Sequence, residues 1–425
     1  MKLFNIRNNT FIRQLGVYTI SSYVNKAIPF LLLPILTKYL TTDAYGEVSM
    51  FLALVNLLVA LFGWSIEGAL VRNFYDKSRD FGVILYNYLI QLICSFTLAA
   101  VVVGTFHNDI NEYCGVSEKY QLLAVLCAFF TVVCGCVNSF HQASEEPLKY
   151  AVFTNGFSLM NALLSIVLVV ACDLSVTGRI LGITLSTTTF GVCGLCIFKR
   201  RGIVKLMDTS IIKEELAVFG IPLLPMNLKG TILNFTDKIF IANLINLSAA
   251  GVYTVSSQIA MLVDVFVRSI ALAYTPWIYK KLGDNTHLSN KSIIKSLYIL
   301  ILVVILVSLL IFFSSKYGIY LILDEQYWGA SDYLFWLMSA NAVMGIQLLL
   351  VNFIYYKKKV KAYSLLSIGS ILLNVLLNYI LIQIDGALGA AKATFFVFSF
   401  TLLATIIIVY KQNPKLPWFF FSQNE

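Results

Sequence analysis

The chain has 425 residues, of which 59% are hydrophobic and 12% are charged, and its mean hydropathy is +0.80. This composition excludes a water-soluble surface and predicts a polytopic membrane protein. The formal net charge is +9. We attribute this basic balance to membrane topology, and we expect no nucleic-acid partner.

About twelve apolar windows are long enough to cross roughly 30 Å of hydrocarbon as helices. In chain order they are 14-37, 46-71, 83-105, 120-140, 150-172, 176-198, 216-243, 251-277, 296-314, 331-355, 364-384 and 387-410. The first window is too long for a signal-peptide core and should stay as an anchor. We expect an all-α fold with two six-helix bundles, residues 1-198 and 216-425, joined by a charged cytoplasmic linker at 199-215 that serves as a hinge.

The orientation follows from the basic residues, because Lys and Arg near span ends are retained in the cytoplasm. With the amino terminus inside, 22 basic residues flank the spans on the inner side, and four fall outside: Lys38, Lys119, Arg179 and Lys316. Both termini are therefore predicted to be cytoplasmic. The outer connections are short, which argues against an enzyme such as a sugar polymerase with a large external loop.

An internal duplication relates two segments 213 positions apart, 150–164 and 363–377. Gly156 and Asn161 of the first segment correspond to Gly369 and Asn374 of the second. Because six spans separate the copies, the halves should be related by an axis along the membrane normal. Such a parallel repeat is typical of transporters.

Cysteine and histidine predict no metal site. All eight cysteines lie in the first half, mostly in apolar windows, where a thiol behaves as a small hydrophobe. Cys193 and Cys196 have metal-site spacing but no nearby histidine. We expect no metal, no cofactor and no catalytic residue.

Ionisable residues inside the spans are the informative ones, because each is costly in lipid unless it faces a cavity or a partner. They are Lys26, Glu67, Lys229, Asp237, Lys238, Asp264, Arg268 and Lys392. Five are cationic and three are anionic. If all face one interior, the excess of cations suits an anionic substrate.

Lys26 and Lys229 lie deep in the first helix of each half, and each has two prolines nearby. Prolines inside spans kink helices and free carbonyl groups, so these helices are expected to line a cavity. The amides of Asn25 and Asn227 lie in the same two windows. They suit sugar hydroxyls, although helix–helix hydrogen bonding explains them equally well.

Structural alternatives exist for the other charges. Asp264 and Arg268 are one helical turn apart, so they form either a local ion pair or a substrate contact. Glu67 can pair with Arg72 near the inner surface, or it can take part in ion coupling. Asp237 is a candidate for ion coupling or for holding Lys229. Lys238 and Lys392 lie near the outer interface, where long side chains snorkel to water.

Two short segments resemble a known family. Residues 28–46 open with Ile28-Pro29-Phe30 and end with Ala44-Tyr45-Gly46, and the second half carries Asp237-Lys238-Ile239 followed by Ala250-Gly251-Val252-Tyr253. These segments resemble the O-antigen and polysaccharide flippases of the multidrug/oligosaccharidyl-lipid/polysaccharide exporter superfamily. Gly46 and Gly251 fall at matching places, 205 positions apart.

The resemblance implies a flippase in the bacterial inner membrane that moves an undecaprenyl-diphosphate-linked oligosaccharide outward by alternating access. In that role Lys26, Lys229 and Arg268 would contact the diphosphate or acidic sugars. The coupling ion, H⁺ or Na⁺, stays open. Implied partners are membrane lipids and the polysaccharide polymerase with its chain-length machinery.

Two related transporters are the alternatives. A cation-coupled multidrug antiporter of the same superfamily shares the span count, but it typically relies on a cavity acid, whereas the first helix here supplies Lys26. The flippase for the lipid-linked peptidoglycan precursor usually has two additional spans.

Overall fold

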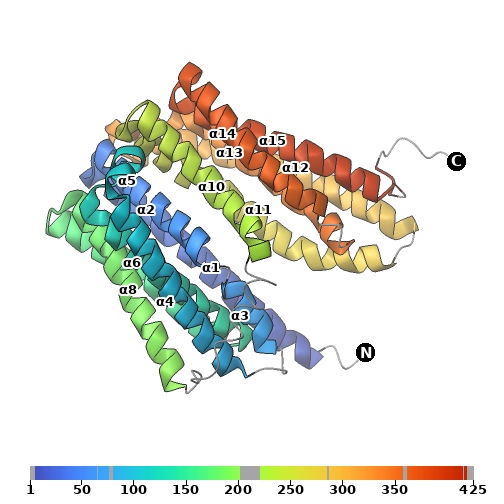
Figure 1. Ribbon diagram of the computed structural model, residues 1–425. Helices are drawn as coiled ribbons and strands as arrows, with labels where there is room; N and C mark the ends of the chain where they lie inside the picture. Colours follow the sequence, from blue (N-terminus) through green and yellow to red (C-terminus); the bar gives the residue numbers. More distant parts are fainter. Residues whose placement is uncertain are drawn as a thin grey trace. The chain divides into compact units, whose positions relative to one another are not determined.

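The computed structural model describes residues 5–64, 66–75, 80–201, 221–284, 287–357, 361–414 and 416–418. Every regular element in these ranges is a helix (Figure 1), which confirms the all-α fold. Eleven helices in the described ranges are long and apolar enough to cross a membrane, and each overlaps one of the predicted windows. The remaining window, 216-243, corresponds to α10 (Ile221–Leu244), a helix of 24 residues.

The chain packs as two compact units, Met1–Gly251 and Val252–Glu425. The first unit contains α1 (Asn5–Tyr39), α2 (Thr42–Phe62), α3 (Ile66–Tyr75), α4 (Phe81–Thr105), α5 (His107–Cys114), α6 (Glu118–Ala143), α7 (Pro147–Ile166), the π-helical turn η1 (Val167–Ala171), α8 (Ser175–Arg200) and α10. The second contains most of α11 (Leu247–Asp284), then α12 (His287–Ile322), the 3₁₀ turn η3 (Glu325–Tyr327), α13 (Ala330–Tyr356), α14 (Lys361–Asp385) and α15 (Ala387–Gln412). The duplicated segments begin α7 and α14, in agreement with a parallel repeat.

Local sequence signals set several helix ends in the first unit. The Thr41 hydroxyl accepts a hydrogen bond from the Ala44 amide at 3.2 Å, and Asp80 accepts one from Gly82 at 2.8 Å. Both are N-caps that satisfy amides at the start of a helix. Pro147 stands in the first turn of α7, where a missing amide proton costs nothing.

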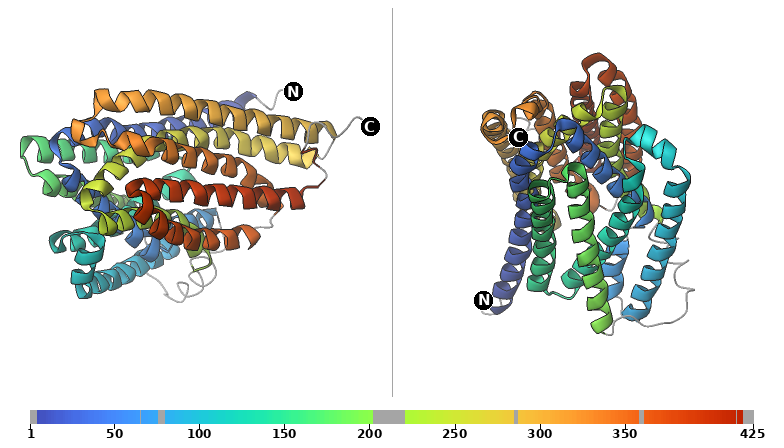
Figure 2. Two further views of the ribbon diagram at one scale, coloured as in Figure 1. Left: turned by 90° about the horizontal axis from the view of Figure 1, so that it is seen from above. Right: turned by 90° about the vertical axis from the view of Figure 1, so that its left-hand side faces the viewer.

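The first unit is a bundle in which α7 packs against α1 and α8, while α6 packs against α2, α3 and α8. These helices run side by side in the right-hand view of Figure 2. A hydrophobic core fills the space between α2, α4, α6 and α8, and it contains many phenylalanines with ring-edge contacts, including Phe96, Phe140 and Phe198.

The predicted window 46-71 is not one straight helix. Helix α2 ends at Phe62, Gly63 caps it, and Trp64 adopts a left-handed φ of 51° before α3 begins at Ile66. The Trp64 indole donates a hydrogen bond to the Ser95 hydroxyl at 2.9 Å, which anchors the break on α4. The break redirects the chain and sets the position of Glu67.

Two glycines meet where the first turns of α2 and α11 cross. A Cβ atom on Gly46 would overlap the carbonyl oxygen of Leu247, and a Cβ atom on Gly251 would overlap the carbonyl oxygen of Thr42. The hydroxyls of Ser248 and Thr42 form a hydrogen bond of 2.6 Å beside this crossing. We call these four residues, Thr42, Gly46, Leu247 and Gly251, the glycine crossing. The contact is reciprocal. The Thr42 carbonyl, four residues before Gly46, faces Gly251, and the Leu247 carbonyl, four residues before Gly251, faces Gly46.

Helix α10 packs against α2 and α5, which groups it with the first unit. Asn243 near its end donates a hydrogen bond to the Tyr113 carbonyl at 2.5 Å. The predicted linker 199-215 lies for the most part outside the described residues. Its role as the boundary between two bundles stays a prediction.

In the second unit, α15 packs against both α13 and α14, and α12 packs against α13. Gln347 of α13 donates a hydrogen bond to the Thr405 hydroxyl of α15 at 3.1 Å. Asn352 of α13 accepts one from Thr275 of α11 at 3.0 Å. These amide side chains therefore join helices within the second unit.

Candidate functional site

Helix α1 presents Lys26 and Asn25 in different surroundings. The Asn25 side chain donates a hydrogen bond to the Thr154 carbonyl of α7 at 3.5 Å. The Tyr18 ring packs edge-on against the Tyr150 ring, which also belongs to α7. Lys26 is exposed, and it has no ion pair or hydrogen bond to any other described residue. Asn25 therefore helps to hold α1 against α7, while the Lys26 ammonium is available to an anion.

Glu67 lies in the first turn of α3, directly after the break. Its carboxylate crosses over α6 at Gly135, where a Cβ atom would overlap it. The side chain is exposed, and among the described residues no ion pair joins it to Arg72. The glycine thus gives the carboxylate room to lie across α6.

Arg179 is a polar anchor inside the first unit that the sequence assigned to an outer flank. It lies in the second turn of α8 and donates from Nη1 to the side-chain Oδ1 of Asn161 at 2.8 Å and to the Ser165 hydroxyl, both on α7. Asn161 in turn donates to Ser186 at 3.1 Å. One signal could have revealed it: Asn161 and Ser165 are one helical turn apart, so they present two acceptors on one face of the preceding window.

Helix α10 carries three of the predicted site residues. Lys229 and Asn227 have backbone positions in the helix, but their side chains lie outside the described residues. Asp237 is buried, with 4% of its surface exposed, and it has a polar partner. Its roles in ion coupling or in holding Lys229 stay predictions.

Asp264 and Arg268 form an ion pair on α11. The Arg268 Nε lies 2.8 Å from both carboxylate oxygens of Asp264. The Asp264 side chain is 12% exposed and that of Arg268 is 53% exposed. No other hydrogen bond to a described residue occupies the guanidinium. The local pair exists, and the two Nη atoms remain open.

Lys392 forms a second local pair. Its ammonium lies 2.7 Å from Asp385 and 5.8 Å from the centre of the Trp336 ring. In the described part of the chain, no group of three His, Cys, Asp or Glu side chains has the geometry of a metal site.

A cluster of charged side chains around Glu146 joins the ends of three helices at the predicted cytoplasmic side. Glu146, just before α7, accepts hydrogen bonds from His141 of α6 at 2.9 Å, Lys149 of α7 at 2.7 Å and Arg201 at the end of α8 at 2.8 Å. Partial burial raises the pKa of the Glu146 carboxyl, but these donors outweigh it and lower the pKa to about 2. We interpret the cluster as structural, because both carboxylate oxygens of Glu146 already accept hydrogen bonds from its members.

Comparison with known families adds a sequence match over most of the chain. A family model described as "Polysaccharide biosynthesis protein" matches residues 11–281, and the MatE family model matches residues 222–380. The first match covers more than half of the chain.

Among the similar curated proteins are two from Haemophilus influenzae. One, named "Uncharacterized membrane protein", is 25% identical over 85% of this chain and 88% of its own length. The other, named "Lsg locus putative protein 1", is 24% identical over 84% of this chain and 88% of its own length. A "Multidrug export protein MepA" from Staphylococcus saprophyticus is 20% identical over 72% of this chain and 69% of its own length.

Similar solved structures include "Lipid II flippase MurJ, inward closed conformation", with a TM-score of 0.74, 13% identity, and coverage of 94% of this chain and 89% of that one. A multidrug resistance MATE family transporter in an inward-facing conformation has a TM-score of 0.73, 14% identity, and coverage of 95% and 99%. At these identities the likeness concerns the fold. Together with the family match, it confirms that this chain belongs to the polysaccharide biosynthesis protein family, a group of multi-pass membrane transporters of the multidrug/oligosaccharidyl-lipid/polysaccharide exporter superfamily.

Proposed function

We propose that this protein moves an undecaprenyl-diphosphate-linked oligosaccharide, such as an O-antigen repeat unit, from the cytoplasmic to the outer face of the bacterial inner membrane. The observation that carries the proposal is the family match over residues 11–281, whose stated process is polysaccharide biosynthesis. A transporter contributes to that process by delivering a precursor across the membrane. The protein has no catalytic role in this proposal.

The cations of the chain support an anionic substrate. Lys26 has no counter-ion among the described residues, and the Arg268 guanidinium keeps its two Nη atoms open beyond Asp264. A diphosphate has several acceptor oxygens that suit such donors. In the proposal Lys26, Lys229 and Arg268 bind the diphosphate or acidic sugars, while Asn25 and Asn227 offer amide oxygens to sugar hydroxyls.

Acidic groups supply the energy coupling. Glu67 has no cationic partner in the described ranges, so it can bind H⁺ or Na⁺, whereas Asp264 balances Arg268. Asp237 is the further candidate for ion coupling. The glycan head passes between two six-helix bundles that hinge at 199-215, and the lipid tail stays in the hydrocarbon. Both termini lie in the cytoplasm in this proposal. The glycan reaches the outer face, where the polymerase and its chain-length machinery receive it.

The test is the sidedness of the lipid-linked oligosaccharide in a deletion strain, read with a sugar-modifying enzyme that acts only at the outer face. Restoring the intact chain should restore modification. Lys26→Ala and Lys229→Ala should each lower it about tenfold, because each removes a charge-assisted hydrogen bond. Lys38→Ala is the matched control, since Lys38 is an exposed cation in the last turn of α1.

Protein amounts are compared by immunoblot in every strain. Full modification in the Lys26/Lys229 double variant would eliminate the cationic contacts. Unchanged sidedness after deletion would eliminate the flippase itself.

The second candidate function is a cation-coupled multidrug antiporter. It is favoured by the likeness to a multidrug export protein from Staphylococcus saprophyticus and by the MatE match over residues 222–380. Loss of the chain would then increase drug susceptibility and leave the glycan in place, so the same deletion strain distinguishes the two functions.

A further inference from the structure

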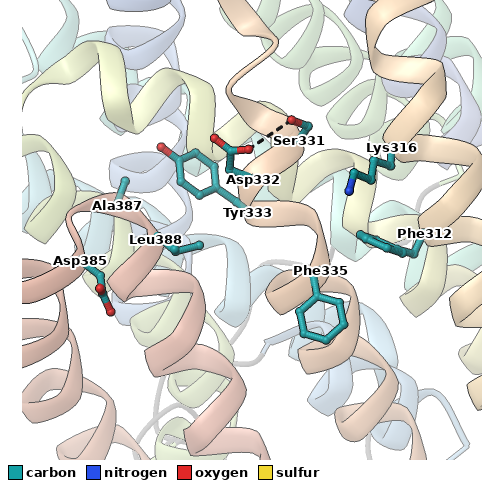
Figure 3. A pocket seen from close by; sticks show the side chains of 9 residues that line it. All are labelled: Phe312, Lys316, Ser331, Asp332, Tyr333, Phe335, Asp385, Ala387 and Leu388. Atoms are coloured by element: carbon teal, nitrogen blue, oxygen red, sulfur yellow. Dashed lines mark hydrogen bonds between the residues drawn. The ribbon is translucent and has the colours of Figure 1, made fainter.

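A polar pocket opens in the second unit where α12, α13 and the turn between α14 and α15 meet. Its volume is about 570 Å³. It is lined by Phe312, Lys316, Ser331, Asp332, Tyr333, Phe335, Asp385, Ala387 and Leu388 (Figure 3). The pocket lies at the predicted outer end of these helices.

Two opposite charges border this pocket from different helices. Lys316 projects from α12 and Asp332 from α13, and both side chains are exposed (Figure 3). The Asp332 carboxylate accepts one long hydrogen bond of 3.4 Å from Ser331. Lys316 has no ion pair with a described residue, and its ammonium lies 5.9 Å from the centre of the Phe312 ring. The third charge, Asp385, is neutralised by Lys392 at 2.7 Å. The pocket therefore offers one cation and one anion that have no ion-pair partner among the described residues.

An apolar groove of about 240 Å³ lies next to the pocket, between α12 and α13. The two cavities share Phe312 and Phe335, whose rings meet edge to face at 5.8 Å. The groove is lined by one stripe of each helix: Ile305, Ser308, Leu309 and Phe312 on α12, and Phe335, Met338, Ser339, Ala342, Val343 and Ile346 on α13.

The length of this groove matches one leaflet. From Phe335 to Ile346 a helix rises about 16 Å, and half of a hydrocarbon core is about 15 Å thick. Small side chains at Ser308, Ser339 and Ala342 leave the space between the helices open. An extended acyl chain fits a groove of this depth and polarity.

Helix α12 is the most hydrophobic and the least buried of the candidate membrane spans in the described ranges, as expected for a helix that faces lipid. Tyr320 near its end packs against Trp328 at 5.4 Å. Tyrosine and tryptophan collect at the level of lipid headgroups. The polar pocket thus lies at headgroup depth and the groove at acyl depth.

We propose that this pocket and groove form a binding site for a membrane phospholipid with a phosphoethanolamine headgroup. Lys316 binds the phosphate, Asp332 binds the primary ammonium, and one acyl chain lies along the groove. A zwitterion matches the two free charges, whereas a diphosphate would meet the Asp332 carboxylate without a second free cation. This site is independent of the proposed glycan transport.

The test uses the purified full chain in nanodiscs that contain a trace of phosphatidylethanolamine with a photoreactive diazirine in its acyl chain. After illumination, peptide mapping should place the label on 305–312 and 335–346. Unlabelled phosphatidylethanolamine should compete at about tenfold lower concentration than phosphatidylglycerol, because the latter lacks the ammonium that Asp332 binds.

Two variants test recognition of the headgroup and binding of the acyl chain separately. Asp332→Asn should remove the preference for phosphatidylethanolamine and keep the labelling, whereas Asp43→Asn, at an exposed acid in the first unit, should change neither. Ala342→Phe should fill the groove and remove the label. Leu310→Phe is its control, because Leu310 lies on α12 outside the groove and is 66% exposed.

Equal competition by both lipids would overturn the headgroup assignment, and so would a preference that survives Asp332→Asn. Label spread evenly over all lipid-facing helices would overturn the groove. Because Asp332→Asn changes an exposed side chain, the proposal remains testable even if Ala342→Phe fails to fold.

Discussion

The Arg268 guanidinium bonds to Asp264 through Nε, while its two Nη atoms have no hydrogen-bond partner among the described residues. Its Nε serves Asp264 at 2.8 Å, and more than half of its side-chain surface is exposed. A pair at a spacing of four residues contributes little to helix stability by itself, about 0.2–0.5 kcal/mol. We therefore expect that Asp264 mainly orients the guanidinium.

A charge swap tests this division of roles. The double variant Asp264→Arg with Arg268→Asp keeps an ion pair at the same spacing, so its unfolding temperature in detergent should equal that of the wild type. Glycan delivery should not return, because the open Nη atoms have moved by one helical turn. A variant that recovers both properties would show that the pair is purely structural.

Sequence reasoning located the Asp264–Arg268 pair but not Arg179. The first needs only helical periodicity, which fixes which side chains share a face. The second needs tertiary structure, because the sequence shows Arg179 only as a basic residue on an outer flank, an exception to the rule that such residues stay in the cytoplasm. Its bonds to Asn161 and Ser165 depend on how α8 packs against α7.

At the scale of helices, the Glu146 cluster gives the first unit a pH-dependent tie between α6, α7 and α8. The folded pKa of about 2 lies below the ordinary carboxyl value of 4.5. The cluster therefore stabilises the fold fully above pH 4.5, and this contribution disappears as the pH falls towards 2.

We predict that Glu146→Gln lowers the stability of the purified protein by about 1 kcal/mol at neutral pH, since the side chain is partly exposed and its ion pairs are screened. The difference in unfolding temperature between wild type and variant should shrink between pH 4.5 and 2. A constant difference across that range would show that the carboxylate charge is irrelevant. Asp109→Gln, at an acid on α5 away from the cluster, is the control.

The glycine crossing makes a second prediction about elements. Gly46→Ala and Gly251→Ala each force a methyl group into a carbonyl oxygen, so each should destabilise the protein by about 1–3 kcal/mol. Gly104 and Gly369 are matched controls, because a Cβ atom at either meets nothing within 4 Å. Alanine there should be neutral or stabilising by up to about 1 kcal/mol. Thermal unfolding in detergent measures all four, and equal behaviour would refute the close approach.

Hydropathy predicted most helices to within a few residues but missed the break between α2 and α3. An apolar window does not reveal a left-handed Trp64, since the conformation is stabilised by its indole bond to Ser95 on another helix. The ends of α11 and α12 also extend beyond the predicted windows, because polar residues continue a helix after it leaves the hydrocarbon.

For the whole molecule, the orientation in the membrane is the property that the basic residues predict. In a variant without the eight native cysteines, Lys119→Cys should react with a membrane-impermeant maleimide in right-side-out vesicles. Arg201→Cys should react only in inside-out vesicles. Both residues are exposed, so accessibility alone does not separate them. The opposite pattern would invert the predicted topology and place the proposed lipid site in the cytoplasmic leaflet.

The parallel repeat was predictable because duplicated segments retain similar residues, while the pairing of α10 with α2 required the structure. A span count does not say which helices touch. The match of Gly46 with Gly251 was visible in the sequence, but their contact was not.

That contact has the form of an isologous interface, in which the same patch on two partners meets itself and every interaction occurs twice. In a dimer of half-length chains, a single glycine codon would serve both sides of such an interface, and one mutation would damage both contacts at once. In the fused chain the two positions are encoded separately, so one mutation damages one contact and leaves its counterpart intact. The duplicated arrangement is therefore more tolerant of mutation, because loss of one glycine leaves the other close approach in place.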